Sequence, residues 1–372
     1  MHDRSQLPDR IHNVQYEYDT RYAMQLCRWI LKPIGIWHLI YSRRSSQGEK
    51  LFSFVLILAC FSGLGFVLVP VVPYILLREK DINTKVKLFG PIGFCITSAI
   101  KYCFLGRRVT AIGKCVEHVE SDWQIVRYQD HRKMMLNNVL VGRRLTTLCV
   151  IFLYTGGMSY HAIMPLFAKT KINDSFTSRP LVYPGYDLFF DPQASPAYEI
   201  IFFMHCLSAV IQYSATTATC SLAAAFATHA CGQVQILMTL LDDLVDGRRT
   251  KDTVEQRLSV IVKHHVRVLR FTTDVEEILR EICLIELVAA TLIICLLEYY
   301  CMMYSKISSA AYDSNWYNLP GHKAVDLIMI ITMSHYPPKL TAGKFCDLSL
   351  NTFSTVLKSS VVYLNLLRTV TQ

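Results

Sequence analysis

Five polar side chains near the end of the chain form the pattern that most clearly indicates a functional surface. They recur at intervals of three, four, seven and three residues, so one helical face would carry Asn351, Ser354, Lys358, Asn365 and Arg368. The residues around them are largely apolar, and polar groups facing lipid are costly. The stripe therefore predicts either the wall of a pore or cavity, or a polar contact between helices.

No pattern in the sequence is typical of an enzyme. The Walker loop and the GxSxG and HExxH motifs are absent from the chain. His264 and His265 are adjacent, so they project in different directions and make a poor metal pair. Glu286 and Glu298 would lie about 18 Å apart along one helix, too far for a paired site. We expect no catalysis, no metal and no cofactor.

The elements that must position the stripe are membrane helices. Apolar residues make up 52% of the chain, charged residues only 18%, and mean hydropathy is +0.28. Six runs come close to or exceed the roughly 20 residues that one crossing needs, at 51–77, 88–105, 145–167, 198–226, 282–304 and 345–370. The sequence predicts an all-α, polytopic helix bundle in a lipid bilayer.

Lys and Arg counts predict the orientation of this bundle. Segments 1–50, 106–144 and 228–281 hold 8 each, whereas 78–87 and 168–197 hold 4 and 3. Positive residues favour the cytoplasmic side, so the N-terminus is expected inside. The net charge of +9 reflects this bias and gives no reason to invoke nucleic acid. The sequon at Asn173 falls on the predicted outer side and is a candidate glycosylation site.

The cytoplasmic segments carry helical periodicity of their own. Apolar residues at helical spacing predict helices over 109–138 and 239–279 that continue the spans. Residues 24–40 mix aromatic and aliphatic residues with Arg28, Lys32 and Pro33, which is typical of an interfacial helix. We expect the helical extensions to pack on each other.

Several motifs make the chain similar to insect odorant receptors. The C-terminal third carries the most specific of them: SNWYNL at 314–319, PPKLTAGKF at 337–345 and LKSSVVYLNLLR at 357–368. Asp122-Trp123, Gly142-Arg143-Arg144 and the 183–200 run also resemble that family. Gustatory-receptor-like channels, the alternative, end in a Thr-Tyr…Gln-Phe pattern, where this chain has Val362-Tyr363…Arg368.

The resemblance implies a fold, a partner and a location. Members have seven helices with the N-terminus inside, and they form hetero-tetramers with an odorant co-receptor in the plasma membrane of olfactory sensory neurons. They act as odour-gated, non-selective cation channels. The expected parts are a cytoplasmic segment 1–50, helices one to five in 51–304, a cytoplasmic anchor in 305–344 and a pore-lining helix in 345–372. Trp316 and Tyr317 would belong to the anchor between subunits.

The resemblance also places a ligand pocket in the outer half of the bundle. Tyr154, Gly157 and His161 share one face of the third span there, and the second and fourth spans offer Ile92, Ile96, Met204 and Ser208. This mostly apolar set suits a small volatile or hydrocarbon ligand. Ordinary helix packing is the alternative for each residue, and His161 fits a hydrogen-bonded core histidine.

One departure from the family concerns its sixth helix. It should sit between Cys301 and Ser308, but the chain runs directly into the segment that normally follows it. Residues 324–333 are apolar but too short to cross. We interpret this as an internal deletion, from a skipped exon or an incomplete gene model, which would make the chain a non-functional variant. A true six-span protein is the alternative. Sequencing the transcript around codons 303–308 distinguishes them.

Two other classes of membrane protein fit less well. A G-protein-coupled receptor would have its N-terminus outside and usually an outer-loop disulfide, whereas the charge bias points inside and segments 78–87 and 168–197 hold no cysteine. A transporter would usually show internal repeats, and none is visible.

Overall fold

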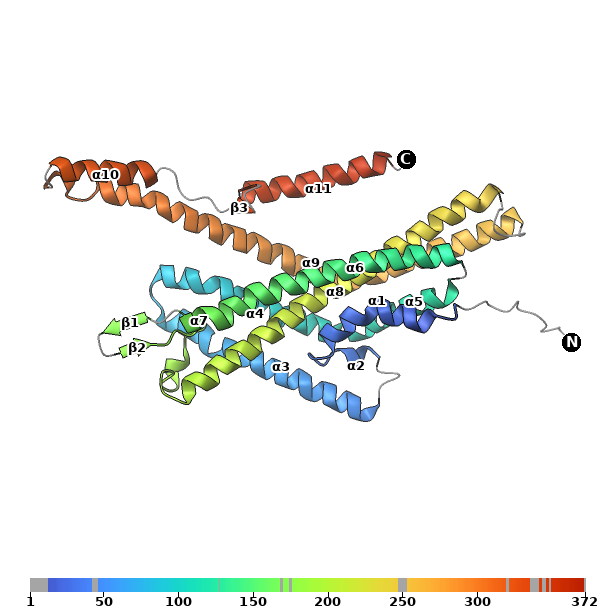
Figure 1. Cartoon of the computed structure of the whole chain (residues 1–372), viewed down its shortest axis with the longest axis horizontal. Coiled ribbons are helices and arrows are strands. Elements are labelled where there is room, and N and C mark those ends of the chain that lie inside the picture. The colour runs from blue at the N-terminus through green and yellow to red at the C-terminus, as the bar shows by residue number, and fades with distance from the viewer. Residues whose placement is uncertain are drawn as a thin grey trace. The chain divides into compact units, whose positions relative to one another are not determined.

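Long helices make up nearly all of the computed structural model (Figure 1). It describes residues 13–41, 46–126, 128–167, 170–173, 176–246, 253–318, 321–334, 341–342, 346–347 and 349–370. The chain forms two compact units, Met1–Leu284 and Ile285–Gln372. The helices are α1 (Tyr16–Leu31), α2 (Trp37–Ile40), α3 (Gln47–Pro73), α4 (Ile82–Arg107), α5 (Val109–Ile125), α6 (Gln129–Met158), α7 (Met164–Phe167), α8 (Ala197–Asp246), α9 (Val254–Tyr312), α10 (Gly321–Ser334) and α11 (Leu350–Val370).

Shorter elements lie between these helices. Two π-helical turns, η1 (Tyr74–Arg78) and η2 (Ser159–Ile163), extend α3 and α6, and two 3-10 turns are η3 (Tyr186–Leu188) and η4 (Trp316–Asn318). The sequence did not predict the two antiparallel strand pairs, β1 (Thr170–Asn173) with β2 (Phe176–Ser178) and β3 (Thr341–Ala342) with β4 (Cys346–Asp347). These pairs are very short, so the all-α architecture holds.

Five helices among the described residues are long and apolar enough to cross a membrane, namely Gln47–Arg78, Thr84–Arg107, Gln129–Ile163, Ala197–Val245 and Val254–Tyr299. They contain or overlap the first five predicted spans. The sixth predicted span overlaps α11, and its role as a crossing stays a prediction. Between 301 and 308, where the family would have its sixth helix, α9 continues without a break to Tyr312.

Local sequence accounts for the ends of several helices. Ser46 and Glu49 form a reciprocal capping box at the start of α3, with Glu49 N to Ser46 Oγ at 3.3 Å and Ser46 N to Glu49 Oε2 at 2.9 Å. Pro70 and Pro73 lie in the last turn of α3, where the missing N–H groups loosen the ladder and η1 follows. Neighbouring helices make such a change tolerable inside a membrane.

The long cytoplasmic helices predicted from periodicity are each interrupted. The expected helix 109–138 divides into α5 and α6, with Val126 in an extended conformation after Ile125. The expected helix 239–279 divides as well, because α8 ends at Asp246 and α9 begins at Val254. The second break falls in the polar run DGRRTKDT at 246–253, a turn signal that the prediction of one continuous helix passed over, whereas the first break carries no Gly or Pro.

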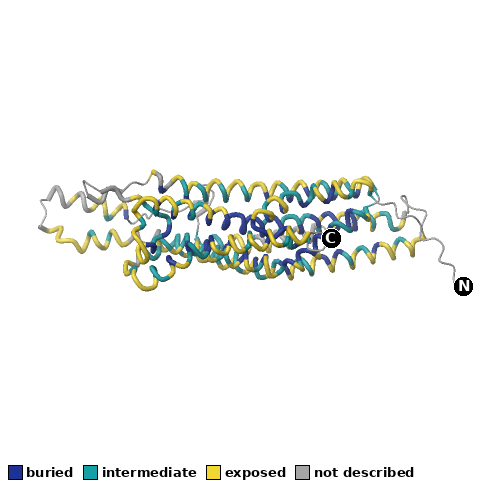
Figure 2. Tube along the Cα trace, turned by 90° about the horizontal axis from the view of Figure 1, so that it is seen from below, coloured by how far each residue is buried: buried dark blue, intermediate teal, exposed yellow. Residues whose placement is uncertain are grey.

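Helix α8 is the central helix of the first unit. In the most apolar 18-residue stretch of α8, 61% is buried, whereas in that of α6 only 17% is buried. The middle of α8 is rich in buried small residues such as Ala215 and Ala218. Small residues let helix backbones approach closely. A Cβ on Gly142 of α6 would lie 2.6 Å from Thr228 Oγ1 of α8, so this glycine permits the close contact. Figure 2 shows buried segments in the interior and exposed residues along the outward helix faces.

The N-terminal helix α1 lies against this core, and its interfacial position stays a prediction. It packs on α8, α5 and α6. Arg132 donates from Nε to Asp19 Oδ2 at 2.6 Å and from Nη2 to Asp19 Oδ1 at 2.7 Å, and Asp19 is fully buried. The Arg143 guanidinium stacks 4.1 Å from the Tyr22 ring and donates to the Tyr22 carbonyl.

Candidate functional site

The predicted pocket residues of the third span lie where α6 changes into a π-helical turn. Gly156 and Gly157 precede this turn, and η2 then carries His161 into the interior, where its side chain is 4% exposed. Single π-turns inside α-helices often occur at functional sites, because the wider turn redirects side chains. The turn therefore aims His161 toward α8.

His161 is the centre of a buried hydrogen-bond network. Its Nδ1 lies 2.7 Å from the Tyr213 hydroxyl and 3.1 Å from the Gly157 carbonyl, and its Nε2 lies 3.1 Å from the Tyr183 hydroxyl. Both ring nitrogens therefore have partners, as expected for a core histidine. The rings of Tyr183 and Tyr213 also contact the imidazole, with centroids 5.7 and 5.9 Å away.

The loop before α8, which the charge bias predicts to face outside, folds inward and completes the cluster. Tyr183 is fully buried, and the Tyr186 hydroxyl donates to the Phe66 carbonyl of α3 at 3.0 Å and lies 3.0 Å from His205 Nε2. Gly185 between them has φ of 109° and sits so close to Pro70 that a Cβ would be 2.4 Å from its carbonyl oxygen. Burial raises the pKa of both the Tyr183 and Tyr186 phenols, so they stay neutral.

The other predicted pocket residues differ in their surroundings. The Tyr154 hydroxyl lies 2.7 Å from Ser214 Oγ, and Ser208 is fully buried and accepts from Gln212 Nε2 at 3.2 Å. Ile92 is buried, Met204 is half-buried, and Ile96 is 40% exposed. The structure thus connects Gly157 and His161 to α8 through Tyr213 and leaves Ile96 on an outward face.

Gly157 permits the closest approach in this cluster. A Cβ at this position would lie 2.1 Å from Tyr213 Cζ, so the tyrosine ring occupies the space beside the glycine. Tyr154 packs edge-on against the same ring at 5.7 Å. The predicted face of Tyr154, Gly157 and His161 is therefore a single surface that Tyr213 covers.

Sequence reasoning missed five residues of the cluster: Tyr183, Tyr186, His205, Gln212 and Tyr213. A signal existed for two of them, because His205, Ser208 and Gln212 share a face of α8 at i, i+3 and i+7. Extending the face of Ser208 by one turn in each direction would have found them. The loop tyrosines carry no comparable pattern, since only the folded loop places them inside the bundle.

The remaining predicted positions lie in the second unit and in the hairpin of β1 and β2. Along α11, Asn351 and Lys358 are exposed and Ser354 is half-buried, whereas the side chains of Asn365 and Arg368 fall outside the described residues. Trp316 and Tyr317 are 43% and 68% exposed. Asn173 ends β1, and the other two sequon residues fall outside the described residues.

Comparison with known proteins gives consistent matches. The model of the family described as 7tm Odorant receptor matches residues 81–308. Odorant receptor 10 of Aedes albopictus is 23% identical over 292 residues, which cover 67% of this chain and 74% of that protein. Two structures of the insect olfactory receptor OR5 from Machilis hrabei, one in complex with eugenol, are 14% identical with TM-scores of 0.57. They cover 93% and 94% of this chain and 99% and 100% of theirs, and at this identity they support the fold.

Proposed function

Because this chain belongs to the insect odorant receptor family, we propose that it is the odorant-binding subunit of an odour-gated, non-selective cation channel. In this proposal it assembles with the odorant co-receptor as a hetero-tetramer in the plasma membrane of olfactory sensory neurons. The observation that carries the binding role is the buried cluster around His161, which joins α6, α8 and the loop predicted to face outside.

The cluster also refines the expected ligand class. Apolar and aromatic walls suit a volatile molecule, but His205 adds a polar handle, because its Nδ1 is buried without a hydrogen-bond partner among the described residues. An unpaired buried nitrogen is costly and gains from a partner. We infer that the odorant is a small apolar molecule with one hydroxyl or carbonyl oxygen, rather than a pure hydrocarbon. Eugenol, which is bound in one structure of the Machilis hrabei receptor, likewise combines apolar surface with a hydroxyl group.

Co-expression tests the channel assignment. Oocytes that express this chain with the co-receptor should give an odour-evoked cation current, and oocytes that express the chain alone should give none. A robust current from the chain alone would contradict the need for a partner. Absence of current in both cases, with the chain at the cell surface, would support the interpretation of a variant that lacks one helix.

Substitution of His205 tests the binding site. His205→Phe keeps a ring against Tyr183 and Tyr186 but removes both nitrogens. A lost hydrogen bond of about 1.4 kcal/mol would raise the half-maximal concentration of an active alcohol about tenfold. The half-maximal concentration of the matched alkane should be the same for the variant as for the wild type. Tyr160→Phe is the control, because Tyr160 is adjacent to His161 but 40% exposed. Equal losses for alcohol and alkane would argue against a polar contact at His205.

A further inference from the structure

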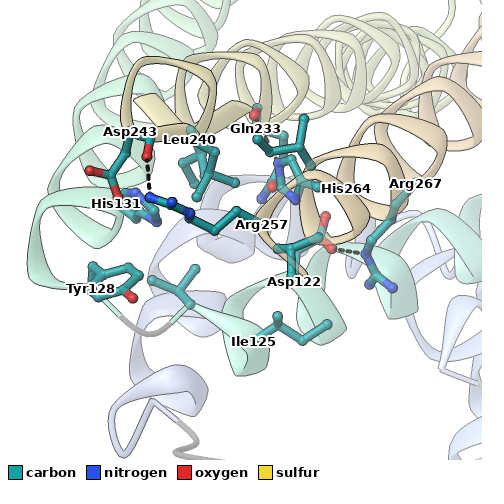
Figure 3. Close-up of a pocket in the computed structure, with 14 residues that line it drawn as sticks. Asp122, Ile125, Tyr128, His131, Gln233, Leu240, Asp243, Arg257, His264 and Arg267 are labelled. Carbon is teal, nitrogen blue, oxygen red and sulfur yellow. Dashed lines mark hydrogen bonds and ion pairs between the residues drawn. The ribbon is translucent and has the colours of Figure 1, made fainter. Parts of the chain in front are cut away.

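A second site lies at the opposite end of the first unit, in segments predicted to be cytoplasmic. A cavity of about 250 Å³ opens between α5, the start of α6, the end of α8 and the start of α9 (Figure 3). Apolar side chains line much of it, namely Ile125, Val126, Ile236, Leu240, Val260 and Ile261. The volume approaches that of small-molecule sites, which are mostly apolar with a few placed polar groups.

The acidic group deepest in this cavity is already neutralised. Asp122 is 5% exposed, and it accepts from Arg267 Nε at Oδ1 and lies 2.9 Å from His229 Nε2 at Oδ2. Burial by itself raises the pKa of Asp122, but the His229 hydrogen bond and the Arg267 charge together hold it below its ordinary value. Arg267 also lines the cavity, and Figure 3 shows its guanidinium paired with the Asp122 carboxylate.

Arg257 is the second arginine that lines the cavity. Its side chain extends from α9 toward Asp243 and His131 (Figure 3), and Nη1 donates to the Asp243 main-chain carbonyl at 3.2 Å. The Arg257 Nε is buried and has no hydrogen-bond partner among the described residues. A buried guanidinium donor of this kind suits a carboxylate, which can accept from two guanidinium nitrogens at once.

The predicted start of the fifth span lies far from this cavity, which argues against a lipid headgroup as the occupant. Ile261 and Ile282, where the fifth predicted span begins, are both on α9. At a rise of about 1.5 Å per residue, about 30 Å of helix separates them. A ligand would therefore enter from the aqueous side.

We propose that this cavity binds a small soluble amphipathic acid from the cytosol, a single carboxylate on a short apolar chain. The carboxylate contacts the Arg257 guanidinium, and the chain packs on Ile236, Leu240 and Ile261. This site is separate from the outer cluster around His161, so it does not depend on the odorant-binding proposal.

Titration calorimetry with the full chain in nanodiscs of neutral phosphatidylcholine tests the proposal. Octanoate should bind saturably, and octan-1-ol, which shares the apolar chain, should bind at least about tenfold more weakly. Arg257→Gln should weaken octanoate binding about tenfold or more, and Leu240→Phe should weaken it by narrowing the apolar end. Arg270→Gln is the matched control, because Arg270 is an exposed arginine on the same helix.

Two further measurements separate this site from the alternatives. His205→Phe should leave octanoate binding unchanged, whereas loss of binding in that variant would place octanoate in the outer cluster and overturn the proposal. Thermal unfolding without ligand shows whether each variant is folded. Unchanged octanoate binding in both folded Arg257→Gln and folded Leu240→Phe would overturn the proposal, and so would equal affinity for octanoate and octan-1-ol.

Discussion

A single carboxylate connects three helices at the end of the first unit that is predicted to be cytoplasmic. Asp122 of α5 accepts from His229 of α8 and Arg267 of α9, and His118 Nε2 lies 3.7 Å away. The Phe271 ring packs against both histidines, with centroids 5.0 and 5.2 Å away. Removing one member of such a buried group leaves a buried charge without its opposite charge, which is strongly destabilising.

Asp122→Asn should therefore destabilise the receptor. The asparagine keeps the size of the side chain but removes the charge that balances Arg267, and breaking a buried ion pair costs on the order of 3 kcal/mol. The thermal unfolding midpoint of the purified chain should fall clearly. Asp242→Asn, at an exposed aspartate of α8, should leave the midpoint unchanged. Equal midpoints for both variants would show that Asp122 is not a stabilising centre.

His118 gives this cluster a pH dependence. Burial, the largest influence, lowers the pKa of His118, and the charge of Asp122 opposes this only in part. A lowered pKa means that the folded state favours the neutral ring, so the stabilisation is complete above the unfolded value of about 6.5 and is lost as pH falls through the folded value. His118→Phe should flatten the decline in unfolding midpoint between about pH 7 and 5. His265→Gln, at an exposed histidine of α9, should show the wild-type decline.

At the scale of elements, α1 is held by charge as well as by apolar packing. Its Met24, Cys27 and Leu31 are buried in the core, and the Asp19–Arg132 pair fixes its first half. Asp19→Asn should release that half, because an uncompensated Arg132 remains at the interface. Hydrogen exchange of the α1 amides should then become faster, with little change in α8. Glu17→Gln, at an exposed position two residues from Asp19, serves as control, and equal exchange in both variants would contradict docking by charge.

The polar stripe of α11 belongs to the same scale. Lys358 is exposed in its unit, and a positive charge on a cation path raises the barrier to cations. If the stripe lines water in the assembled channel, cysteines at 358 and 365 should react with a soluble thiol reagent and alter the current carried with the co-receptor. Cysteines at Leu357 and Leu364 should not. No effect at any of the four positions, in a receptor that conducts, would identify the stripe as a helix contact.

At the scale of the whole molecule, the question is which ends of the helices face the cytoplasm. The Lys and Arg bias of 8, 8 and 8 against 4 and 3 predicts that segments 106–144 and 228–281 are cytoplasmic. A sequon engineered near Ile125 should therefore remain unglycosylated in cells, while Asn173, in the hairpin predicted to face outside, is the positive control. A glycan at the engineered site would show that the topology is the reverse of the predicted one and that the Arg257 cavity faces outside.

The sequence by itself determined the class of protein, the all-α fold and the positions of the first five apolar helices. Apolar runs and helical spacing are local properties, so they survive in the sequence and can be read without knowing what packs where. The face of Tyr154, Gly157 and His161 was predictable for the same reason. The break after Asp246 was also readable, because the polar run DGRRTKDT at 246–253 interrupts the apolar pattern, whereas the break after Ile125 carries no Gly or Pro to mark it.

Only the tertiary structure decided what those faces meet. Tyr213 contacts His161 across 52 residues of chain, and Asp122 contacts His229 and Arg267 across 107 and 145 residues. Such pairs depend on which helices lie side by side, and no periodicity within one segment records that choice. Only the tertiary structure shows that His205 Nδ1 and Arg257 Nε are buried without a hydrogen-bond partner among the described residues. Whether a polar atom has a partner depends on its surroundings and not on its residue type.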